Sequence, residues 1–279
     1  MKVDLSDKVA VVTGGGGVLC SRFAVALAES GARVAVLNRT LSKAQTVVDE
    51  IRAGGGEAAA VQADVMDRRS LERAREEISA LYGGCDILVN GAGGNNPVAT
   101  ADDEFFDPRT LADPDKKSFF DLEESGFTSV FGLNIVGVLL PTQVFALDMV
   151  EKGGGGIINV SSMNAFTPLT KIPAYSAAKA AVSNFTQWLA VHFAPSGIRC
   201  NAIAPGFFST AQNKTLLWNE DGTPTARTGK ILRNTPMGRL GLPEELTGAL
   251  LWLCDDAASG FVTGIVIPVD GGFSAYSGV

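Results

Sequence analysis

A tyrosine and a lysine stand four positions apart in the sequence Tyr175-Ser-Ala-Ala-Lys179. They open an alanine-rich apolar run, AYSAAKAAVSNFTQWLAVHFA, which we predict to be a helix. Positions four apart on a helix share one face, so the Tyr175 hydroxyl and the Lys179 ammonium can reach one small volume. A free phenol titrates near ~10, and a nearby cation favours the phenolate and lowers that pKa. A tyrosine tuned in this way can exchange a proton with a substrate oxygen.

The pattern Tyr-x-x-x-Lys is short and common, so an ordinary surface pair on an amphipathic helix is the alternative interpretation. The surrounding elements decide between the two. Residues 8–13 (KVAVVT) form a continuous apolar run, as expected of a strand buried on both faces. Four glycines, Gly14 to Gly17, follow it, and apolar residues then recur at helical spacing. Strand, glycine turn and helix together predict a dinucleotide-binding unit, whose helix N-terminus receives a pyrophosphate.

The end of the second predicted strand, Arg33–Asn38, is where such folds discriminate between cofactors. An acidic residue there binds a ribose 2′-hydroxyl, whereas arginine accommodates a 2′-phosphate. This chain has Asn38, Arg39 and Thr40, with Lys43 nearby and no carboxylate. We therefore expect NADP or NAD, with NADP favoured. Alternatively, Arg39 stacks on the adenine, which is compatible with NAD, or is solvated.

Strands and helices alternate along the rest of the chain. This alternation predicts an α/β fold with a Rossmann-type, doubly wound parallel sheet flanked by helices. The further predicted strands are residues 57–62, 86–90, 157–160, 198–203 and 265–269, and the further predicted helices are residues 42–53, 67–82, 127–150 and 243–255. No polar linker divides the chain, so we expect a single domain over residues 1–279, of which 46% are hydrophobic.

Charge and cysteine content argue against several classes of protein. The net charge of −7 is unlike that of a nucleic-acid-binding protein, which normally has a basic face. No apolar run reaches the ~18 residues of a membrane span, and the N-terminal stretch lacks the features of a signal peptide. We therefore expect a cytoplasmic protein without membrane or nucleic-acid partners. Four scattered cysteines and a single histidine predict reduced, buried thiols and no metal site.

Two irregular segments interrupt the alternation, near residues 95–124 and 207–239. The first is rich in Asp, Phe and Pro and directly follows a predicted strand, at the edge where open α/β sheets bind ligands. Irregular stretches of this length are more often functional than structural filler. We interpret residues 95–124 as a substrate lid or a subunit contact, with a tolerated surface insertion as the alternative.

In this order of motifs the chain resembles the short-chain dehydrogenase/reductase family, from residue 8 to residue 272. The resemblance rests on Thr13-Gly14 with its glycine loop, Asp64-Val65, Asn90-Gly91-Ala92-Gly93, Asn134, Ser162, Tyr175-x-x-x-Lys179 and Pro205-Gly206. Each motif is weak alone, but together they are specific. The resemblance implies an NAD(P)-dependent oxidoreductase and a homotetramer.

The resemblance also implies roles for individual residues. Tyr175 would be the general acid/base, and Lys179 would lower its pKa and hold the nicotinamide ribose. Ser162, preferred over Ser161 by its spacing, would hydrogen-bond the reacting oxygen, and Asn134 would anchor a proton-relaying water. The implied cofactor-binding residues are Thr13, Gly14, Gly15, Gly16, Gly17, Val18, Leu19, Asn38, Arg39, Asp64, Val65, Asn90, Gly91, Ala92, Gly93, Tyr175, Lys179, Pro205 and Gly206.

One motif departs from the family pattern. The family loop reads Thr-Gly-x-x-x-Gly-x-Gly, whereas this chain has Val18 and Cys20 at the last two glycine positions. A valine side chain leaves the pyrophosphate less room to approach the backbone than glycine does. A cysteine is likewise larger than glycine where the helix packs closely against the sheet. We expect a shifted but working phosphate loop.

At a finer level the chain looks like the mannonate oxidoreductase (fructuronate reductase) branch. This finer resemblance rests on the stretches TGGGGVLC, NGAGGNNP, SSMNAFTPLTKIPAYSAAK, APGFF and PVDGGFSAYSGV. That resemblance implies reduction of a sugar-acid ketone, best matched by D-fructuronate and D-mannonate. Amides suit a polyhydroxylated substrate, and Lys171 or Arg227 could pair with its carboxylate. The candidate substrate residues are Asn95, Asn96, Asn164, Lys171, Phe207, Gln212 and Asn213, although each could be an ordinary loop or core residue.

Two rival functions remain open at this point. One is reduction of another polyol, keto-sugar or 3-oxoacyl substrate by the same chemistry. The other is a non-catalytic nicotinamide-binding protein on a retained fold. The presence of Asn134, Ser162, Tyr175 and Lys179 together argues against the second, because a cofactor sensor has no need of a proton relay.

Overall fold

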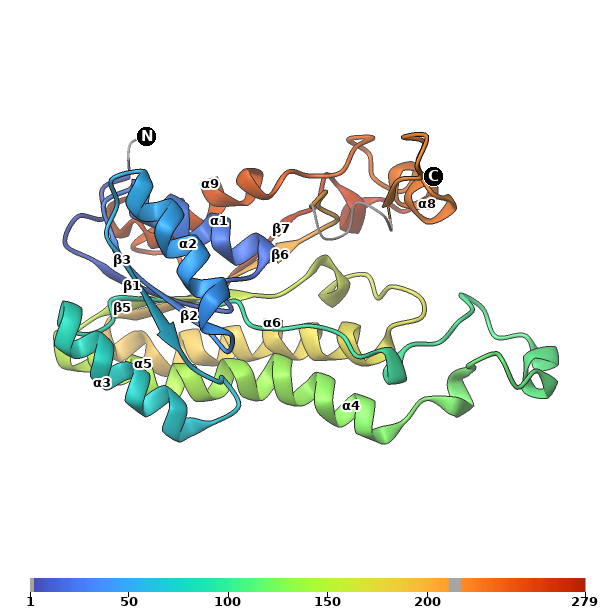
Figure 1. Ribbon diagram of the computed structural model, residues 1–279, viewed down its shortest axis with the longest axis horizontal. Coiled ribbons are helices and arrows are strands. Elements are labelled where there is room, and N and C mark those ends of the chain that lie inside the picture. The colour runs from blue at the N-terminus through green and yellow to red at the C-terminus, as the bar shows by residue number, and fades with distance from the viewer. Residues whose placement is uncertain (1–2, 211–216, 279) are drawn as a thin grey trace.

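A seven-stranded parallel sheet forms the centre of the computed structural model, which describes residues 3–210 and 217–278 (Figure 1). The long apolar runs predicted as strands pair in the order β3-β2-β1-β4-β5-β6-β7, with every pairing parallel. The strands are β1 (Val9–Thr13), β2 (Arg33–Asn38), β3 (Ala58–Gln62), β4 (Ile87–Asn90), β5 (Gly155–Val160), β6 (Ile198–Pro205) and β7 (Val266–Val269). The predicted doubly wound α/β fold is confirmed.

Helices cover both faces of the sheet, which explains why its central strands are apolar on both sides. One face packs against α1 (Val18–Glu29), α2 (Leu41–Ala53) and α9 (Thr247–Cys254). The other packs against α3 (Arg68–Tyr82), α5 (Gly137–Lys152) and α6 (Pro173–Phe193). Successive residues of β1 point into opposite layers, with Ala10 and Val12 in the first core and Val9 and Val11 in the second.

Several element boundaries predicted from the sequence agree with the structure. The second strand has the predicted bounds, and the Asp67 carboxylate caps α3 by accepting from the backbone N–H of Arg69. Gly31, which follows α1, has a positive φ of 96°, a conformation that glycine adopts at little cost. The four cysteines are free and buried, in agreement with the predicted thiols.

Three predicted segments need correction. Residues 127–150 were expected as one regular helix, but α4 (Glu124–Phe131) meets α5 through a π-helical turn, Gly132–Val136. The segment 207–239 is not irregular throughout, because it contains α8 (Ala226–Arg233), capped by the Thr225 hydroxyl. Within residues 243–255, a 3₁₀ turn, Pro243–Leu246, precedes α9.

The continuous helical stretch Glu124–Lys152 also corrects the expectation about membrane spans. Its 29 residues and mean hydropathy of 1.9 make it long and apolar enough to cross a membrane. Half of that apolar window is buried inside the fold, however, as in the core helix of a globular α/β protein. This feature is therefore weak support for a membrane span.

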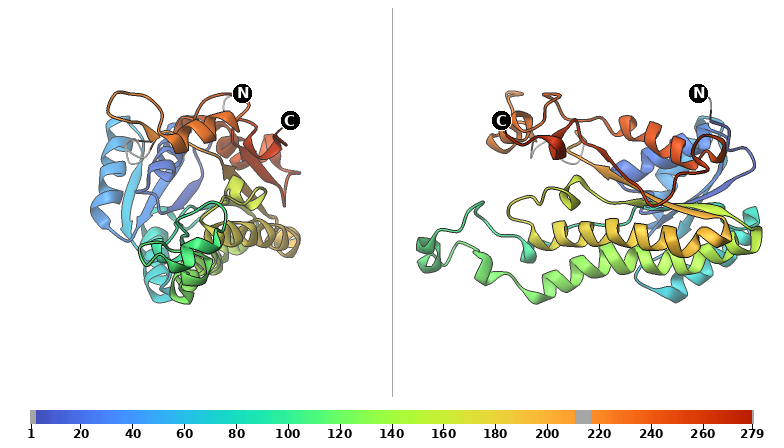
Figure 2. Two further views of the ribbon diagram at one scale, coloured as in Figure 1. Left: turned by 90° about the vertical axis from the view of Figure 1, so that its right-hand side faces the viewer. Right: turned by 180° about the vertical axis from the view of Figure 1, so that it is seen from behind.

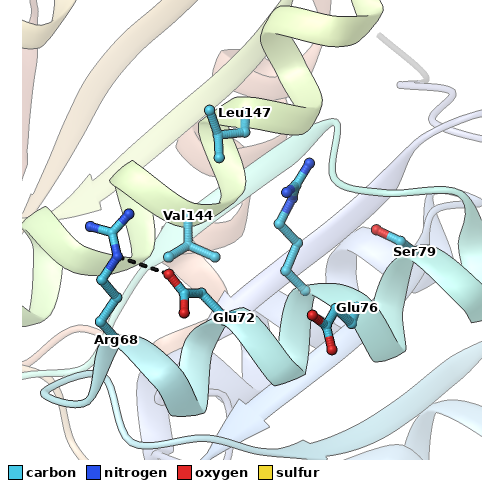
Figure 3. A pocket seen from close by; sticks show the side chains of 7 residues that line it. Arg68, Glu72, Glu76, Ser79, Val144 and Leu147 are labelled. Atoms are coloured by element: carbon cyan, nitrogen blue, oxygen red, sulfur yellow. Dashed lines mark hydrogen bonds and ion pairs between the residues drawn. The ribbon is translucent and has the colours of Figure 1, made fainter.

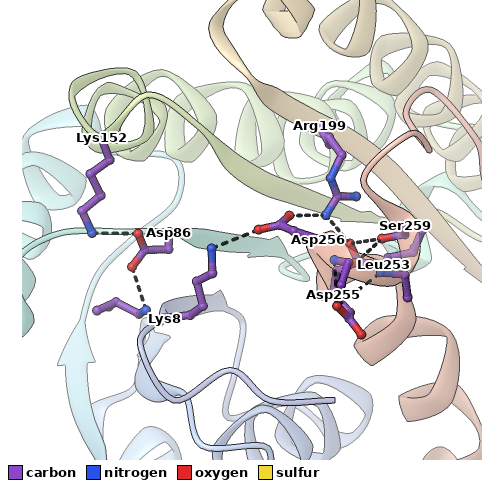
Figure 4. A network of polar contacts seen from close by, with 11 residues as sticks. Lys8, Asp86, Lys152, Arg199, Leu253, Asp255, Asp256 and Ser259 are labelled. Atoms are coloured by element: carbon purple, nitrogen blue, oxygen red, sulfur yellow. Dashed lines mark hydrogen bonds and ion pairs between the residues drawn. The ribbon is translucent and has the colours of Figure 1, made fainter. Parts of the chain in front are cut away.

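Charged side chains join the amino-terminal ends of the strands (Figure 4). Asp86 accepts from the Val9 backbone N–H at 2.8 Å and from the Lys152 ammonium at 3.0 Å. Asp256 bridges Lys8 at 3.0 Å and Arg199 at 2.9 Å. Because these contacts lie at the edge opposite the glycine loops, we assign them to stability of the sheet.

Residues 95–124, called the arm below, project beyond the N-terminal end of α6 (Figures 1 and 2). The arm contains three short 3₁₀ turns, Pro97–Ala99, Pro108–Ala112 and Phe119–Asp121, and no strand. The predicted irregular segment is thus observed, and it stands apart from the layers of the α/β body.

Candidate active site

A crevice opens at the carboxyl ends of β1, β4 and β5, where the sheet order changes direction around β1 and β4. Its volume is about 580 Å³. Open α/β sheets bind ligands at such a position. The lining residues are Gly14, Gly16, Gly17, Val18, Leu19, Cys20, Asn38, Arg39, Thr40, Lys43, Ala63, Asp64, Val65, Met66, Gly91, Ala92, Gly93, Gly94, Leu133, Val160, Tyr175 and Lys179.

Two glycine loops meet in this crevice. Gly14 has a φ of 63°, and a Cβ there would lie 2.9 Å from backbone atoms of Ala92, so only glycine fits. The Thr13 hydroxyl accepts from the N–H groups of Gly91 (3.1 Å) and Ala92 (3.3 Å), which ties the loop after β4 to the end of β1. The backbone of both loops is therefore left open to a ligand the size of a dinucleotide.

The departures from the family loop are accommodated locally. Helix α1 begins at Val18, directly after the glycines, and Gly17 is its N-cap. Cys20 is buried with its thiol against Gly91, where any added Cβ would collide with the sulfur. Cys20 can replace the family glycine because position 91 has no side chain. The helix N-terminus remains directed at the crevice, as anion binding requires.

At the end of β2, cations lie on the same wall of the crevice. Arg39 and Lys43 line it together with Asn38, whose side-chain amide donates to the Thr40 carbonyl at 3.0 Å. A Cβ added to Gly16 would touch Lys43. The backbone of Lys43 therefore lies beside the phosphate loop. Asp64, after β3, lines the crevice farther along. The chemistry of these donors fits either NAD or NADP.

Tyr175 and Lys179 line the crevice from the first turns of α6. The Lys179 Nζ lies 5.7 Å from the centre of the Tyr175 ring and donates to the Val160 carbonyl at 2.7 Å. Only 4% of Lys179 is exposed, and this burial lowers its pKa to about 8. The two side chains share a face of the helix, as their spacing predicts.

The pKa of Tyr175 is raised, mainly because burial disfavours the phenolate; the hydrogen bond with Ser162 opposes this shift. The predicted net lowering of the phenol pKa is therefore not found. Desolvation dominates, because the ring packs among Ala99, Val130, Ala174 and Ala178. The phenol stays protonated at neutral pH, and it can act as a proton donor.

The two serines after β5 are used differently. Ser161 bonds to the Ser183 hydroxyl at 2.7 Å and to the Lys179 carbonyl at 3.1 Å, so it fastens α6 to the sheet. Ser162 caps the turn Met163–Ala165 and bonds to the Tyr175 phenol. This geometry favours Ser162 over Ser161 as the partner of the reacting oxygen.

Asn134 occupies the π-helical turn between α4 and α5 and is fully buried. Its amide donates to the carbonyls of Gly94 (2.7 Å) and Val130 (2.8 Å), and its oxygen accepts from the Gly94 N–H at 3.3 Å. A Cβ on Gly93 would lie 2.7 Å from the Asn134 Oδ1 and 3.2 Å from the Lys179 Nζ. Asn134 and Lys179 thus flank the same glycine. Single π turns are frequent at functional sites.

A buried polar network beneath the crevice was not predicted in full. Asn90 donates to the Thr142 hydroxyl (3.0 Å) and to the Asn159 oxygen (2.9 Å), and Asn159 donates to the Thr186 hydroxyl (2.9 Å). The network joins β4 and β5 to α5 and α6. The available signal was Asn159 within the apolar strand IINV, since a buried amide requires partners.

The remaining predicted residues are more dispersed. Pro205 ends β6, and the Gly206 N–H donates to the Val269 carbonyl at 3.0 Å; neither lines the crevice. A Cβ on Gly206 would lie 2.6 Å from Asp270, so this position also requires glycine. Gly15 packs its backbone on Val12 and Val36, below the crevice.

Two of the candidate substrate residues use their side-chain amides for hydrogen bonds within the arm. Asn95 donates to the Thr100 hydroxyl at 2.9 Å, and Asn96 caps the turn Pro97–Ala99. Asn164 is buried behind Ser162. Lys171 is exposed and has a φ of 73°, a strained conformation for a residue other than glycine.

Phe207 is half-buried and packs edge-to-face on Phe273 at 5.3 Å. Arg227 is exposed on α8. The predicted residues Gln212 and Asn213 lie outside the described part of the chain. Of the polar candidates that are described, Lys171 and Arg227 therefore keep their charged groups at the surface, where a carboxylate can reach them.

A second pocket, of about 390 Å³, lies between α3 and α5 (Figure 3). Arg68 pairs with Glu72 at 2.9 Å, and Arg75 pairs with the buried Asp148 at 2.6 Å. The cations of this pocket are thus neutralised by neighbouring carboxylates, and neither Tyr175 nor Lys179 lines it. We assign no chemistry to this pocket.

Comparison with known proteins agrees with this geometry. Residues 8–221 match the sequence profile of the family described as short chain dehydrogenase. The chain is 56% identical over 276 residues to the uncharacterized oxidoreductase UxuB of Bacillus subtilis, covering 99% of this chain and 98% of that protein.

Two solved structures are also similar. A candidate D-mannonate oxidoreductase from Haemophilus influenzae with bound NAD superposes with a TM-score of 0.95 at 56% identity, covering 99% of this chain and 98% of that one. A gluconate 5-dehydrogenase from Burkholderia cenocepacia, in complex with NADP and tartrate, gives a TM-score of 0.81 at 31% identity, with 98% of each chain covered.

Proposed function

The chain belongs to the short-chain dehydrogenase family, and it is an NAD(P)-dependent oxidoreductase; on that premise we propose that it interconverts a ketone and a secondary alcohol on a sugar acid, with D-fructuronate and D-mannonate as the best candidates. The observation that carries the proposal is the position of Tyr175. Its phenol bonds to Ser162 on the wall of the crevice that holds the two glycine loops.

A bound nicotinamide supplies or accepts the hydride, as in other enzymes that use this cofactor. Tyr175 donates the proton to the carbonyl oxygen, and Ser162 shares the developing negative charge through its hydroxyl. Burial raises the phenol pKa, so the protonated form needed for reduction is the populated one at neutral pH.

Lys179 and Asn134 would restore the proton. The lowered pKa of about 8 makes Lys179 a group that exchanges protons near neutral pH. Asn134 lies across Gly93 from the Lys179 ammonium, where its carbonyl oxygen can orient a water. In this proposal Tyr175 takes up its replacement proton through these two residues.

A sugar-acid substrate is supported by two kinds of observation. The relatives named above include a candidate D-mannonate oxidoreductase and a gluconate dehydrogenase bound to tartrate, both linked to polyhydroxylated acids. In this chain, the exposed ammonium of Lys171 sits four residues before Tyr175, where it could pair with a substrate carboxylate. Asn95, Asn96, Asn164, Phe207, Gln212 and Asn213 remain candidate contacts.

Initial rates with D-fructuronate and with neutral ketoses, each with NADH and with NADPH, test the proposal. We expect a kcat/KM for the uronate well above that for ketoses lacking the carboxylate. Higher activity on an uncharged ketose or an acyl thioester would favour the rival reductase function. Tight nicotinamide binding without turnover on any substrate would favour a binding protein.

We also propose that NADP is preferred over NAD, because Arg39 and Lys43 line the adenosine end of the crevice without a carboxylate between them at positions 38–43. The bound NAD of the Haemophilus structure supports the opposite preference. Comparison of Kd for NADPH and NADH by tryptophan fluorescence distinguishes the two.

We propose further that the chain forms one catalytic domain, works in the cytoplasm and assembles as a homotetramer. Exposed apolar side chains on α5 and α6 support the assembly, since large exposed apolar faces mark interfaces. Leu147, Val150, Trp188 and Val191 are 48%, 48%, 55% and 78% exposed. His192 stacks on Trp188 at 4.6 Å in this face, in line with a packing role.

A further inference from the structure

A further cavity lies on the substrate side of the molecule, outside the crevice. Its volume is about 780 Å³, and three segments line it: the arm, the stretch before α6 and helix α8. These segments follow β4, β5 and β6, and the carboxyl ends of parallel strands meet at one edge of a sheet. This cavity, called the outer cavity below, therefore lies at the same edge as the crevice.

A smaller cavity, of about 210 Å³, continues from the outer cavity toward the catalytic helix. The two cavities share Glu104 and Lys171, and the smaller one extends to Pro173, the first residue of α6. Tyr175 lies two residues farther along that helix. The outer cavity thus adjoins the end of α6 that carries the reacting phenol.

The charged residues of the outer cavity pair with one another, except for one. Four cations and three carboxylates line it, which gives a net charge of +1. The ion pairs are Arg109–Asp107, Lys116–Asp103 and Lys230–Glu104. Lys171 forms no ion pair within residues 3–210 and 217–278, so its ammonium is the cation left for a ligand. An ammonium in such a position can bind a carboxylate.

The arm fixes the backbone of Lys171. This residue has a φ of 73°, and its carbonyl accepts from the Ala101 N–H at 2.8 Å. A strained backbone of this kind persists only where the surrounding structure imposes it, and such residues cluster at ligand sites. The place of the Lys171 ammonium therefore depends on the place of the arm.

One ion pair joins the outer part of the arm to α8, at the end of the molecule where both lie (Figure 1). Lys230 donates to the two carboxylate oxygens of Glu104, at 2.7 and 2.8 Å. In the described ranges, no other hydrogen bond or ion pair connects residues 103–116 to residues outside the arm. The hydrogen bond from Lys230, and to a smaller extent the charge of Lys171, lowers the pKa of Glu104. The Glu104 carboxylate thus lies near both lysines.

We propose that Glu104 and Lys230 are positioning residues: their ion pair holds the arm against α8, so that Lys171 receives the single negative charge of a monocarboxylate substrate in the outer cavity. The inference rests on the proposed reaction of a sugar acid and adds the charge that the substrate must carry. A second negative charge is disfavoured, because the cavity has a net charge of only +1 and the arm has nine Asp or Glu against three Lys or Arg.

Three ketoses that differ at one end test the charge preference. D-fructuronate has one negative charge there, D-fructose has none and D-fructose 6-phosphate has about two. We expect the highest wild-type kcat/KM for the uronate. Lys171→Met should raise the KM for the uronate about 10- to 100-fold, as loss of a charge-assisted contact does, and leave the KM for D-fructose unchanged. A wild-type preference for the phosphate, or an unchanged KM for the uronate in Lys171→Met, would overturn the proposal.

Variants of the ion pair test the positioning role. Glu104→Gln and Lys230→Met should each raise the KM for the uronate about two- to fivefold, the range of an exposed ion pair, with kcat within about twofold of wild type. The exchange Glu104→Lys/Lys230→Glu should restore the KM, because the pair forms again with its ends reversed. Glu72→Gln is the matched control, since it breaks the exposed Arg68–Glu72 pair of α3 and should change neither constant. Failure of the exchange to restore the KM would exclude the ion pair as the cause.

A double-mutant cycle separates positioning from a merely structural role. Because Glu104 acts through Lys171, adding Glu104→Gln to Lys171→Met should not raise the KM for the uronate further. An additional two- to fivefold rise, or an equal rise for D-fructose in Glu104→Gln, would show that the pair acts on something other than Lys171, and the inference would be wrong.

Calorimetric titration of D-mannonate onto the protein with NADH bound distinguishes failure of this inference from failure of the proposed reaction. Binding that Lys171→Met weakens, without turnover of D-fructuronate, would retain the carboxylate site and refute the reaction. Turnover of D-fructuronate together with D-mannonate binding that Lys171→Met leaves unchanged would refute the inference alone. Absence of D-mannonate binding to wild type would overturn both.

Discussion

The Asn134 side chain bonds in both directions to the backbone of Gly94, donating to its carbonyl at 2.7 Å and accepting from its N–H at 3.3 Å. This pair joins the π-helical turn between α4 and α5 to the loop after β4. The same loop includes Gly93, which separates Asn134 from the Lys179 ammonium. One buried amide thus joins the turn to the loop, with the Lys179 ammonium on the other side of Gly93.

Replacing Asn134 with Ala should lower kcat about 10²-fold, the loss expected when a catalytic group is misplaced by about 1 Å. Cofactor affinity should change less, because the glycine loops lack direct bonds to the amide except at Gly94. Steady-state rates and cofactor Kd measure the two effects. Asn184→Ala is the control, since it removes an exposed amide of α6 that does not line the crevice. Equal kcat values for both variants would contradict the role of Asn134.

The lowered pKa of Lys179 predicts a pH dependence of stability. The folded protein releases the Lys179 proton at about 8, whereas the unfolded chain keeps it to about 10.5. Between these values the unfolded state binds more protons, so the free energy of unfolding should rise with pH. The contribution is about 2–3 kcal/mol between pH 8 and 10.

Urea unfolding of wild type and Lys179→Met across that range measures this contribution. The difference in free energy of unfolding between them should grow in favour of wild type as pH rises. The phenol of Tyr175 has the opposite effect only above its unfolded pKa of 10, so the window ends there. A difference that stays constant with pH would show that Lys179 titrates normally.

Asn159 should matter for stability more than for chemistry. Asn159→Leu leaves the Asn90 amide and the Thr186 hydroxyl with fewer partners in a buried site. Each unsatisfied buried group costs about 1–3 kcal/mol. Urea unfolding should show a loss in this range, while Asn184→Ala, at an exposed position of α6, should stay within about 0.5 kcal/mol of wild type. Comparable losses for both would exclude the network as the cause.

Arg39→Ser should weaken NADPH binding and leave NADH binding nearly unchanged. Loss of a charge-assisted contact to the 2′-phosphate would cost about 1.5–3 kcal/mol, roughly 10- to 100-fold in Kd. Fluorescence titration of both cofactors measures the change. Equal weakening of both cofactors would indicate that Arg39 stacks on the adenine instead.

The parts of this structure that follow from local pattern were predictable. The apolar runs give the strands, the glycines after β1 and β4 mark the ligand edge, and the spacing of Tyr175 and Lys179 puts them on one face of α6. Asp67 was recognisable as a helix cap because an Asp before a helical run satisfies free backbone donors.

Other features depend on contacts between distant segments. The π-helical turn at Asn134 has no sequence period of its own, and the amide within it bonds to Gly94, 40 residues earlier. The sign of the Tyr175 pKa shift depends on packing by Ala99 and Val130, which the spacing to Lys179 does not reveal. Likewise α8 is short and stabilised by tertiary packing of Ile231 against Leu217 and Leu240.

The central claim is that the Tyr175 phenol passes the proton to the substrate oxygen. Tyr175→Phe removes only the hydroxyl and keeps the ring in its small apolar cluster. We predict that kcat with D-fructuronate falls by about 10²–10⁴-fold, the usual contribution of a general acid, while Kd for NADPH stays within about twofold of wild type. Normal turnover in this variant, with the cofactor bound as before, would contradict the account.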